Sequence, residues 1–253
     1  MSRRTPAVPP PALWLVATIL AVGAAQAAQP PLSLPLAAGA RVGVLNLLDA
    51  EVTHFHGSRR LEDSYLKTYP VDWPVSAMLL GAVKPALMRL GLTAVPLAAT
   101  EELSAARESC LNEAALARAL PRECGPLLSQ LAAAQRLDAI IVLAPRRNDA
   151  AATRQRELPQ YLRGWCVVSG EGAAGSAPVL LSLTELLLIG VSGQGVQLLD
   201  RERDGDERSA SGFTPPPDPR AIPAGELAQL QPLFASVLAQ QADALLAHLE
   251  LKR

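Results

Sequence analysis

The sequence predicts a single α/β domain over residues 41–253, built on a mixed α+β sheet. Three observations predict it. Strand-like and helical segments alternate in the first half, three strand-like runs separated by glycine-rich turns follow, and a long amphipathic segment closes the chain. Alternating strand-like and helical segments favour parallel strands covered by helices, whereas strand-like runs joined by glycine-rich turns favour an antiparallel meander.

The first strands are expected directly after a proline-rich lead, residues 28–40. Residues 41–48 (RVGVLNLL) are apolar and of strand length, which predicts a strand buried on both faces. Residues 49–56 (DAEVTHFH) alternate between polar and apolar side chains, which predicts an adjoining strand. Residues 65–71 (YLKTYPV) predict a third strand, although Pro70 weakens it.

A helix is predicted after this third strand. Asp72 is the expected capping acid and Pro74 fits the first turn. Helically spaced apolar residues continue to Leu90, Pro85 is expected to kink the helix, and Gly91 to end it.

The next elements repeat the strand–helix order. Residues 92–97 predict a strand, and Thr100 is the expected cap of a helix running towards Leu120. Residues 126–136 predict another helix. Residues 137–144 (LDAIIVLA) form the clearest buried strand of the chain.

The second half predicts the meander and the closing helix. Strands are expected at 161–169, 179–191 and 196–203, and a charged, proline-rich loop at 204–223. Residues 224–249 carry leucines, a valine and a phenylalanine on one broad helical face, which predicts a long helix packed on the sheet.

The N-terminus predicts export. Arg3 and Arg4 precede an uncharged apolar stretch, residues 12–25, and residues 25–27 (AQA) fit the small-x-small cleavage rule. We therefore expect a signal peptide over residues 1–27, a mature chain that begins at Ala28, and a soluble periplasmic protein; an uncleaved anchor is the alternative.

Composition excludes several classes of function. The formal net charge is −1, and aromatic residues make up only 4% of the chain. Both values argue against a nucleic-acid binder with a basic surface or stacking platforms. No later segment is apolar and long enough to predict an integral membrane protein.

Three cysteines occur in a chain expected in an oxidising compartment. Cys110 and Cys124 flank a helical stretch and are the expected disulfide pair. Cys166 lies in an apolar run (WCVV) and is interpreted as a small buried residue of a strand rather than a reactive thiol.

The best candidate for a metal site is the segment DAEVTHFH. His54 and His56 are two apart, so on a strand both imidazoles face the same side. Asp49 and Glu51 could complete a set of ligands for zinc or copper. The alternative is a polar strand face at the edge of the sheet.

A second candidate is a binding surface for a partner protein or glycan, formed by Tyr65, Tyr69 and Trp73 in a chain poor in aromatics. The alternative is that Trp73 fills the core at the start of the helix while the tyrosines cover a sheet edge.

Three segments carry a family resemblance: RVGVLNLLDA from Arg41, MRLGLTAVPL from Met88 and AAAQRLDAIIVLA from Ala132. With the following meander, this order resembles the periplasmic α/β fold of the TolB amino-terminal domain, CsgG-type secretion proteins and LpoB-type regulators of cell-wall synthases. Two features depart from it: a lipid-attachment cysteine is missing, and residues 49–71 are an unusual insertion. The resemblance implies a role in envelope assembly or binding and transfers no site residue.

No nucleophile or acid–base pair stands out, so the sequence predicts a binding or envelope-assembly accessory protein without catalytic activity, with an envelope protein as partner. The alternative is a metal-binding or metal-dependent periplasmic protein that uses His54 and His56. A third possibility is a small-molecule binder that uses a crevice at the end of the sheet.

Overall fold

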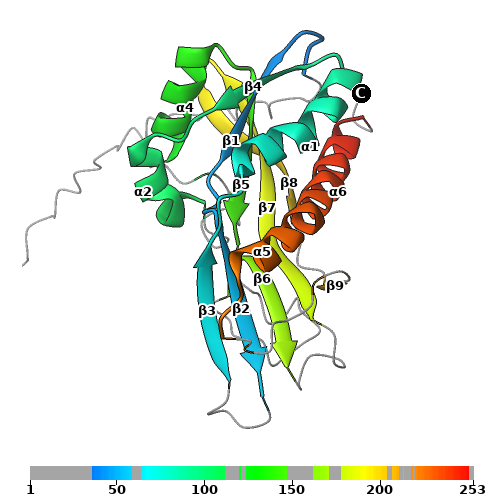
Figure 1. Cartoon of the computed structure of the whole chain (residues 1–253). Helices are drawn as coiled ribbons and strands as arrows, with labels where there is room; N and C mark the ends of the chain where they lie inside the picture. The colour runs from blue at the N-terminus through cyan, green and yellow to red at the C-terminus, as the bar shows by residue number, and fades with distance from the viewer. Residues whose placement is uncertain are drawn as a thin grey trace, which may run out of the picture. The chain divides into compact units, whose positions relative to one another are not determined.

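The computed structural model describes residues 36–58, 64–111, 120, 124–146, 162–170, 178–203, 207–210, 213, 218 and 220–250 (Figure 1). Several sequence predictions lie wholly or partly outside these residues: the signal peptide, most of the proline-rich lead, residues 112–119 of the predicted second helix and half of the loop at 204–223.

The long strand β7 (Val179–Ser192) runs through two parts of the structure, which we call the upper and the lower sheet. The upper sheet of Figure 1 has the order β4-β1-β5-β7-β8, in which β4, β1 and β5 are parallel and β7 is antiparallel to both β5 and β8. This confirms the mixed sheet and the buried strand predicted in the apolar LDAIIVLA segment. The strand bounds are Arg41–Asn46 for β1, Thr93–Leu97 for β4, Ala139–Pro145 for β5, Val179–Ser192 for β7 and Gly195–Arg203 for β8.

The lower sheet of Figure 1 contains β3, β2, β6, the first half of β7, and β9. Residues 179–183 of β7 pair with β6, and residues 184–190 pair with β5. One continuous strand therefore joins the two sheets, which fixes the lower sheet to the helix-covered upper sheet. The remaining strand bounds are Glu51–Gly57 for β2, Tyr65–Pro70 for β3, Gly164–Gly170 for β6 and Glu207–Ser209 for β9.

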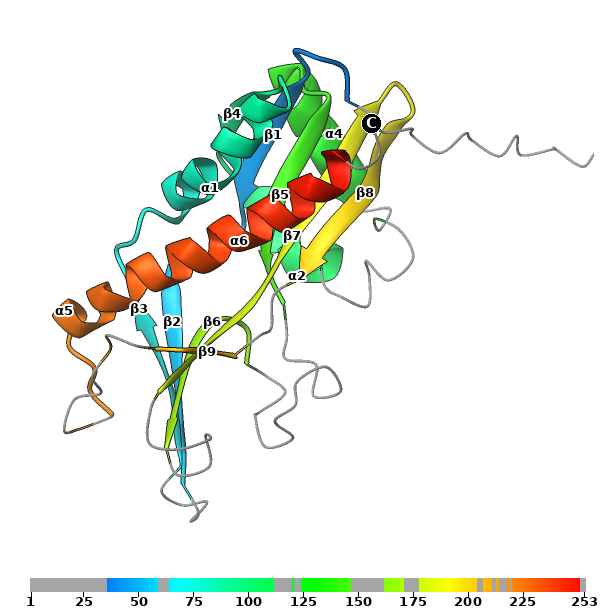
Figure 2. The same ribbon diagram turned by 90° about the vertical axis from the view of Figure 1, so that its right-hand side faces the viewer.

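Helices cover both faces of the upper sheet (Figure 2). The core cluster on one face contains residues of α1 and α6, and the cluster on the other face contains residues of α2 and α4. This arrangement confirms the α/β class and the long C-terminal helix. The helical bounds are Val75–Arg89 for α1, Glu101–Cys110 for α2, Cys124–Gln135 for α4, Ala224–Leu227 for α5, Ala228–Leu230 for the 3-10 turn η2 and Gln231–Glu250 for α6.

Two predicted helix ends are confirmed, the glycine after α1 and the threonine cap of α2, whereas α2 ends at Cys110, with Leu111 as its C-cap, and does not run towards Leu120 as predicted. Gly91 follows α1 with φ of 67°, and the Leu92 amide donates to the Leu87 carbonyl at 2.8 Å, the backbone pattern that favours glycine after a helix. The Thr100 hydroxyl accepts from the Leu103 amide at 3.2 Å and caps α2. The capping role predicted for Asp72 is wrong, because Pro74 takes the N-cap position of α1 without a side-chain hydrogen bond.

A short strand lies where the sequence predicted only a loop. Residues 207–209 form β9, which pairs with residues 179–181 of β7. Its sequence, two charged residues and a serine, has no hydrophobic pattern that could predict a strand. Backbone pairing with β7 alone defines this strand.

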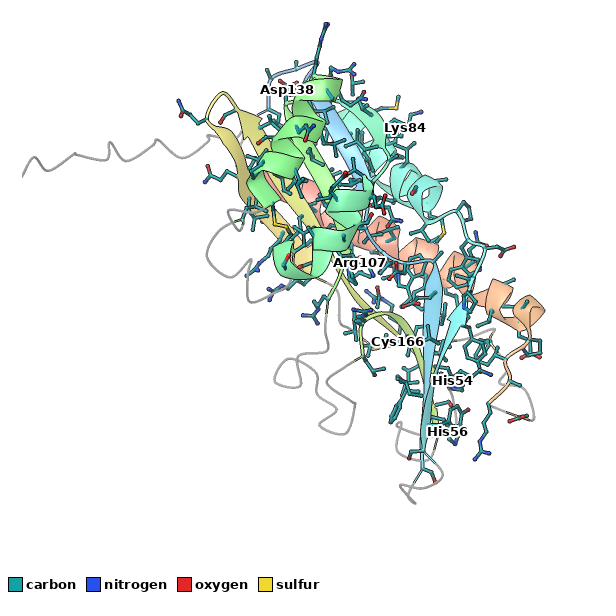
Figure 3. All side chains as sticks on the ribbon, turned by 90° about the vertical axis from the view of Figure 1, so that its left-hand side faces the viewer. His54, His56, Lys84, Arg107, Asp138 and Cys166 are labelled. Atoms are coloured by element: carbon teal, nitrogen blue, oxygen red, sulfur yellow. A yellow bond between two sulfur atoms is a disulfide. The ribbon has the colours of Figure 1, made fainter. Side chains whose placement is uncertain are left out.

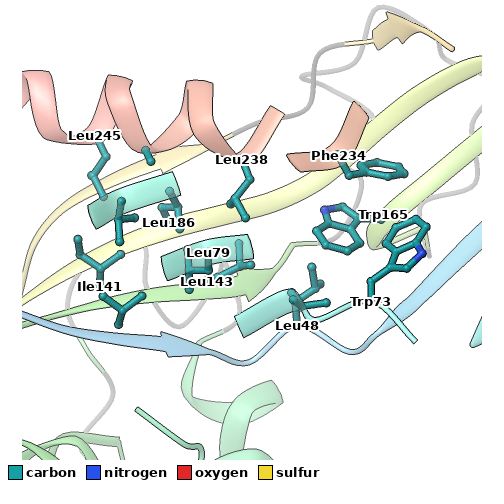
Figure 4. Close-up of a cluster of buried hydrophobic side chains, with 14 of the residues drawn as sticks. Leu48, Trp73, Leu79, Ile141, Leu143, Trp165, Leu186, Phe234, Leu238 and Leu245 are labelled. Atoms are coloured by element: carbon teal, nitrogen blue, oxygen red, sulfur yellow. The ribbon is translucent and has the colours of Figure 1, made fainter. Parts of the chain in front are cut away.

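Three aromatic side chains join the lower sheet to the helices (Figure 4). The Trp165 ring stacks on Phe234 of α6 with centroids 5.1 Å apart, and both lie within 6.0 Å of Trp73. Trp73 is 5% exposed. It therefore belongs to the core, as the alternative interpretation held, and not to an exposed binding surface.

The cysteines lie as the sequence predicted. Cys110 ends α2 and Cys124 begins α4, and their sulfurs lie at disulfide distance, 2.13 Å. Cys166 of β6 is buried, and burial raises the pKa of its thiol to about 12. Among the described residues, no helix combines the length and apolar character that crossing a bilayer needs.

Candidate functional site

Ser169 brings the two predicted histidines together. His54 and His56 lie on the same face of β2, and the register with β6 sets His56 opposite Ser169. The Ser169 Oγ atom lies 2.7 Å from His54 Nε2 and 3.0 Å from His56 Nδ1. Figure 3 shows the two imidazoles following each other along β2.

The serine hydroxyl restricts which nitrogens of the two rings carry a hydrogen. A hydroxyl has one hydrogen to donate and two lone pairs to accept with. When both hydrogen bonds are formed, at most one imidazole accepts from Ser169, and the other donates its N–H to Oγ. Two imidazoles that both contact this hydroxyl therefore cannot both present a bare nitrogen to it: at least one of them carries its hydrogen on the nitrogen that faces Oγ.

Tyr65 of β3 closes the cluster. Its ring stacks on His56 with centroids 5.2 Å apart and meets the His54 ring edge-on at 5.5 Å. Its hydroxyl lies 3.5 Å from His54 Nδ1. Together, His54, His56, Tyr65 and Ser169 are called the histidine–serine site.

The Tyr65 hydroxyl stays protonated at neutral pH. Burial raises the pKa of Tyr65 to about 12, Tyr69 and Asp218 add to the increase, and the cation of Arg220 opposes it. The Arg220 guanidinium lies 5.9 Å from the ring centroid. Tyr65 therefore offers a neutral phenol that can donate or accept a hydrogen bond.

Burial falls along the site from one end to the other. His54 is 1% exposed and Ser169 is also buried, whereas His56 and Tyr65 are partly exposed. His56 and Tyr65 therefore form the more accessible end of the site, and His54 and Ser169 form its buried end.

The predicted carboxylates lie away from the histidines. Arg107 donates to both Asp49 carboxylate oxygens, at 2.7 and 2.5 Å, and also to the Leu47 carbonyl at 3.2 Å. This pair fixes the crossover from β1 to β2 and commits Asp49 to a structural role. Figure 3 shows Arg107 well separated from both histidines.

Side chains alternate between the two faces of a strand, and Glu51 lies three residues before His54 on β2. Its side chain is therefore on the opposite face from His54 and His56. The four predicted ligands therefore do not form one set. Within the described ranges, no group of three or more His, Cys, Asp and Glu side chains is arranged to hold a metal ion.

The predicted aromatic surface is reduced to one tyrosine. Tyr69 is buried, its hydroxyl donates to the Arg220 carbonyl at 2.9 Å, and the Ile222 amide donates to that hydroxyl at 3.4 Å. Lys67 donates to the same carbonyl at 2.8 Å. Tyr69 therefore anchors the segment leading to α5, and only Tyr65 remains partly exposed.

Sequence reasoning missed Ser169. The serine is the sixth residue of the strand GWCVVSG, 115 positions from His54, and no local pattern connects them. Only the parallel pairing of β2 with β6 places it between the two imidazoles.

Comparison with known proteins assigns no family. No family model matches the chain, and no curated protein matches it. A solved structure, that of the hypothetical protein CT253 from Chlamydia trachomatis, overlaps 81% of this chain and 97% of its own with 10% identity and a TM-score of 0.39. A similarity at this level assigns neither family nor function.

Proposed function

We propose that this chain is an exported accessory protein of the cell envelope that binds a partner protein through the histidine–serine site. The observation that carries the proposal is the gathering of two imidazoles, a phenol and a hydroxyl on one face of the lower sheet, with His56 and Tyr65 partly exposed. Polar groups held on a rigid sheet are pre-organised for recognition.

Two features support export. Residues 1–27 have the pattern of a signal peptide, and Cys110 and Cys124 lie at disulfide distance. Disulfides persist in oxidising compartments such as the periplasm, so both features favour the same location.

The surroundings of the site favour a polar or acidic segment of the partner. Lys67 and Arg220 are exposed beside Tyr65, and their cations lie 4.9 Å from the Tyr69 ring and 5.9 Å from the Tyr65 ring, respectively. His56 and Tyr65 add hydrogen-bonding groups, and the two cations outnumber the one carboxylate, Asp218, that acts on Tyr65 among the described residues. Cations next to aromatic rings attract carboxylates while the rings provide contact area.

Photo-crosslinking of the full chain in its own cells tests this function. With p-benzoylphenylalanine in place of Tyr65, we expect an adduct with an envelope protein, identified by mass spectrometry, and we expect the His56→Ala change to reduce its yield. Position 88 is the matched control, because Met88 is 64% exposed on α1. Equal adducts from both positions, or none from position 65, would contradict the proposal.

The convergence of His54 and His56 on a shared point favours a second candidate, zinc binding by the two imidazoles. If the two imidazoles bind zinc, added Zn²⁺ is expected to raise the melting temperature of the untagged protein. The increase should disappear in His54→Ala and in His56→Ala but persist in His248→Ala. An unchanged melting temperature, or an increase that all three variants retain, excludes it.

A further inference from the structure

The strand β3 forms an outer edge of the lower sheet. It pairs with β2 and with no other described strand, and Figure 1 shows it as the outermost strand of that sheet. The backbone groups on the free side of an edge strand can pair with an extended segment of another chain. The outer strand of the upper sheet, β4, carries Pro96 in its interior, whereas the proline of β3, Pro70, is its last residue.

The hydrogen-bond pattern shows which residues of β3 face the free edge. The Val71 amide donates to the Ala50 carbonyl at 2.9 Å, and these two residues continue the register of β3 with β2 by one position. In an antiparallel pair, the backbone groups of successive residues point alternately towards and away from the partner strand. Leu66 and Thr68 therefore direct their N–H and C=O groups away from β2. Within the described part of the chain, no hydrogen bond engages these groups.

The side chains along this edge are exposed and differ between its two faces. Leu66 is 41% exposed, and Lys67 and Thr68 are exposed as well. Lys67 lies opposite His54 in the register, so it shares the face of the histidine–serine site, whereas Leu66 and Thr68 lie on the other face. The Lys67 ammonium donates to the Arg220 carbonyl at 2.8 Å, and its three hydrogens allow it to bind a further acceptor.

Lys67 makes this edge unfavourable for a second copy of the chain. If two copies paired Leu66 of one with Thr68 of the other in antiparallel fashion, the two Lys67 side chains would lie directly opposite each other. That position is not hydrogen-bonded, so the side chains come closest there, and like charges are destabilising. A lysine on an edge strand is a common protection against such self-association. An acidic residue in the same place would pair with Lys67 instead.

We propose that the free edge of β3 binds an extended segment of a partner protein as an added antiparallel strand, with an acidic residue opposite Lys67 and an apolar residue opposite Leu66. Hydrogen bonds to the backbone of Leu66 and Thr68 provide affinity, and the alternating acidic and apolar side chains provide selectivity. This inference rests on the proposed function only in that the partner is a protein, because it uses the edge of β3 and not the hydroxyl and imidazole groups of the histidine–serine site.

Fluorescence anisotropy of the purified full chain with two labelled peptides tests the charge at this edge. Both peptides have blocked ends and consist of threonines around a centre, which is Val-Glu-Val in one peptide and Val-Lys-Val in the other. We expect saturable binding of the glutamate peptide and binding weaker by about fivefold or more for the lysine peptide. Lys67→Glu should reverse this preference, a result that damage to the fold would not produce.

Thr68→Pro tests the backbone pairing. It removes the N–H that faces the free edge and leaves the hydrogen bonds to β2, as Pro70 already does at the end of the strand. We expect it to weaken binding of the glutamate peptide by about tenfold. Thr68→Val is the matched control, because it also removes the hydroxyl that lies 3.2 Å from the Thr53 hydroxyl but keeps the amide, and it should bind as the wild type does.

The results that would overturn the proposal are equally specific. They are failure of both peptides to bind, wild-type binding of both peptides by those of the Thr68→Pro and Lys67→Glu proteins that fold, and equal weakening by Thr68→Val and Thr68→Pro. A dimer of the chain that Thr68→Pro abolishes would also overturn it, because the edge would then belong to a second copy. The photo-crosslink at position 65 does not depend on these peptides, so failure of one test leaves the other intact.

Discussion

The Trp165→Ala variant is expected to lose about 3–5 kcal/mol of unfolding free energy, the usual cost of removing a buried tryptophan from a packed core. Trp165 is 2% exposed and lies between Trp73, at the start of α1, and Phe234 of α6. Its loss leaves a cavity where the lower sheet meets two helices. Denaturant unfolding of the wild type and the variant measures the difference.

Met88→Ala is the control for this prediction. Met88 is the most exposed of the large apolar side chains described, so its truncation is expected to change the unfolding free energy by no more than about 0.5 kcal/mol. A cost for Trp165→Ala as small as that for Met88→Ala would show that the three aromatic rings do not hold the lower sheet to the helices.

Removal of the disulfide is expected to cost about 3 kcal/mol, the chain-entropy value for a closed loop of about 15 residues. Cys110 and Cys124 are fully buried at the end of α2 and the start of α4, with Cα atoms 5.3 Å apart. The double variant Cys110→Ala/Cys124→Ala should therefore melt well below the oxidised wild type. Cys166→Ala, which removes a buried thiol that forms no disulfide, is the control and should keep its response to reductant.

Thiol counting on the wild type provides the independent check. The pKa of the Cys166 thiol, raised to about 12 by burial, keeps it protonated and unreactive at pH 8, where its thiolate is needed for alkylation. Maleimide should therefore label no thiol in the folded protein and one thiol after unfolding without reductant. Labelling of all three cysteines under the second condition would contradict the disulfide.

Local pattern was sufficient to predict most elements of the fold. The continuous apolar runs of β1 and β5 predict adjacent buried strands, and the structure pairs Val42 with Ala139 in parallel. Two kinds of element could not be predicted in this way. β9 is a short charged edge strand, and the start of α1 depends on backbone geometry at Pro74 rather than on the nearby acid.

The candidate site was predictable only within one strand. Two-residue periodicity places His54 and His56 on one face of β2, as the sequence indicated. The identity of their neighbours depends on contacts between distant segments. Arg107, on α2, takes Asp49 out of the predicted ligand set, and Ser169 enters the site through pairing of strands more than 100 residues apart.

The central claim is that a single hydroxyl links two imidazoles at the histidine–serine site, and nitrogen NMR of the histidine rings tests it most directly. We expect Ser169→Ala to shift the ring-nitrogen resonances of both His54 and His56, because each loses its hydrogen bond to Oγ. His248, the third histidine of the chain, is the internal reference. Unchanged resonances for His54 and His56, or a change in only one of them, would contradict the claim.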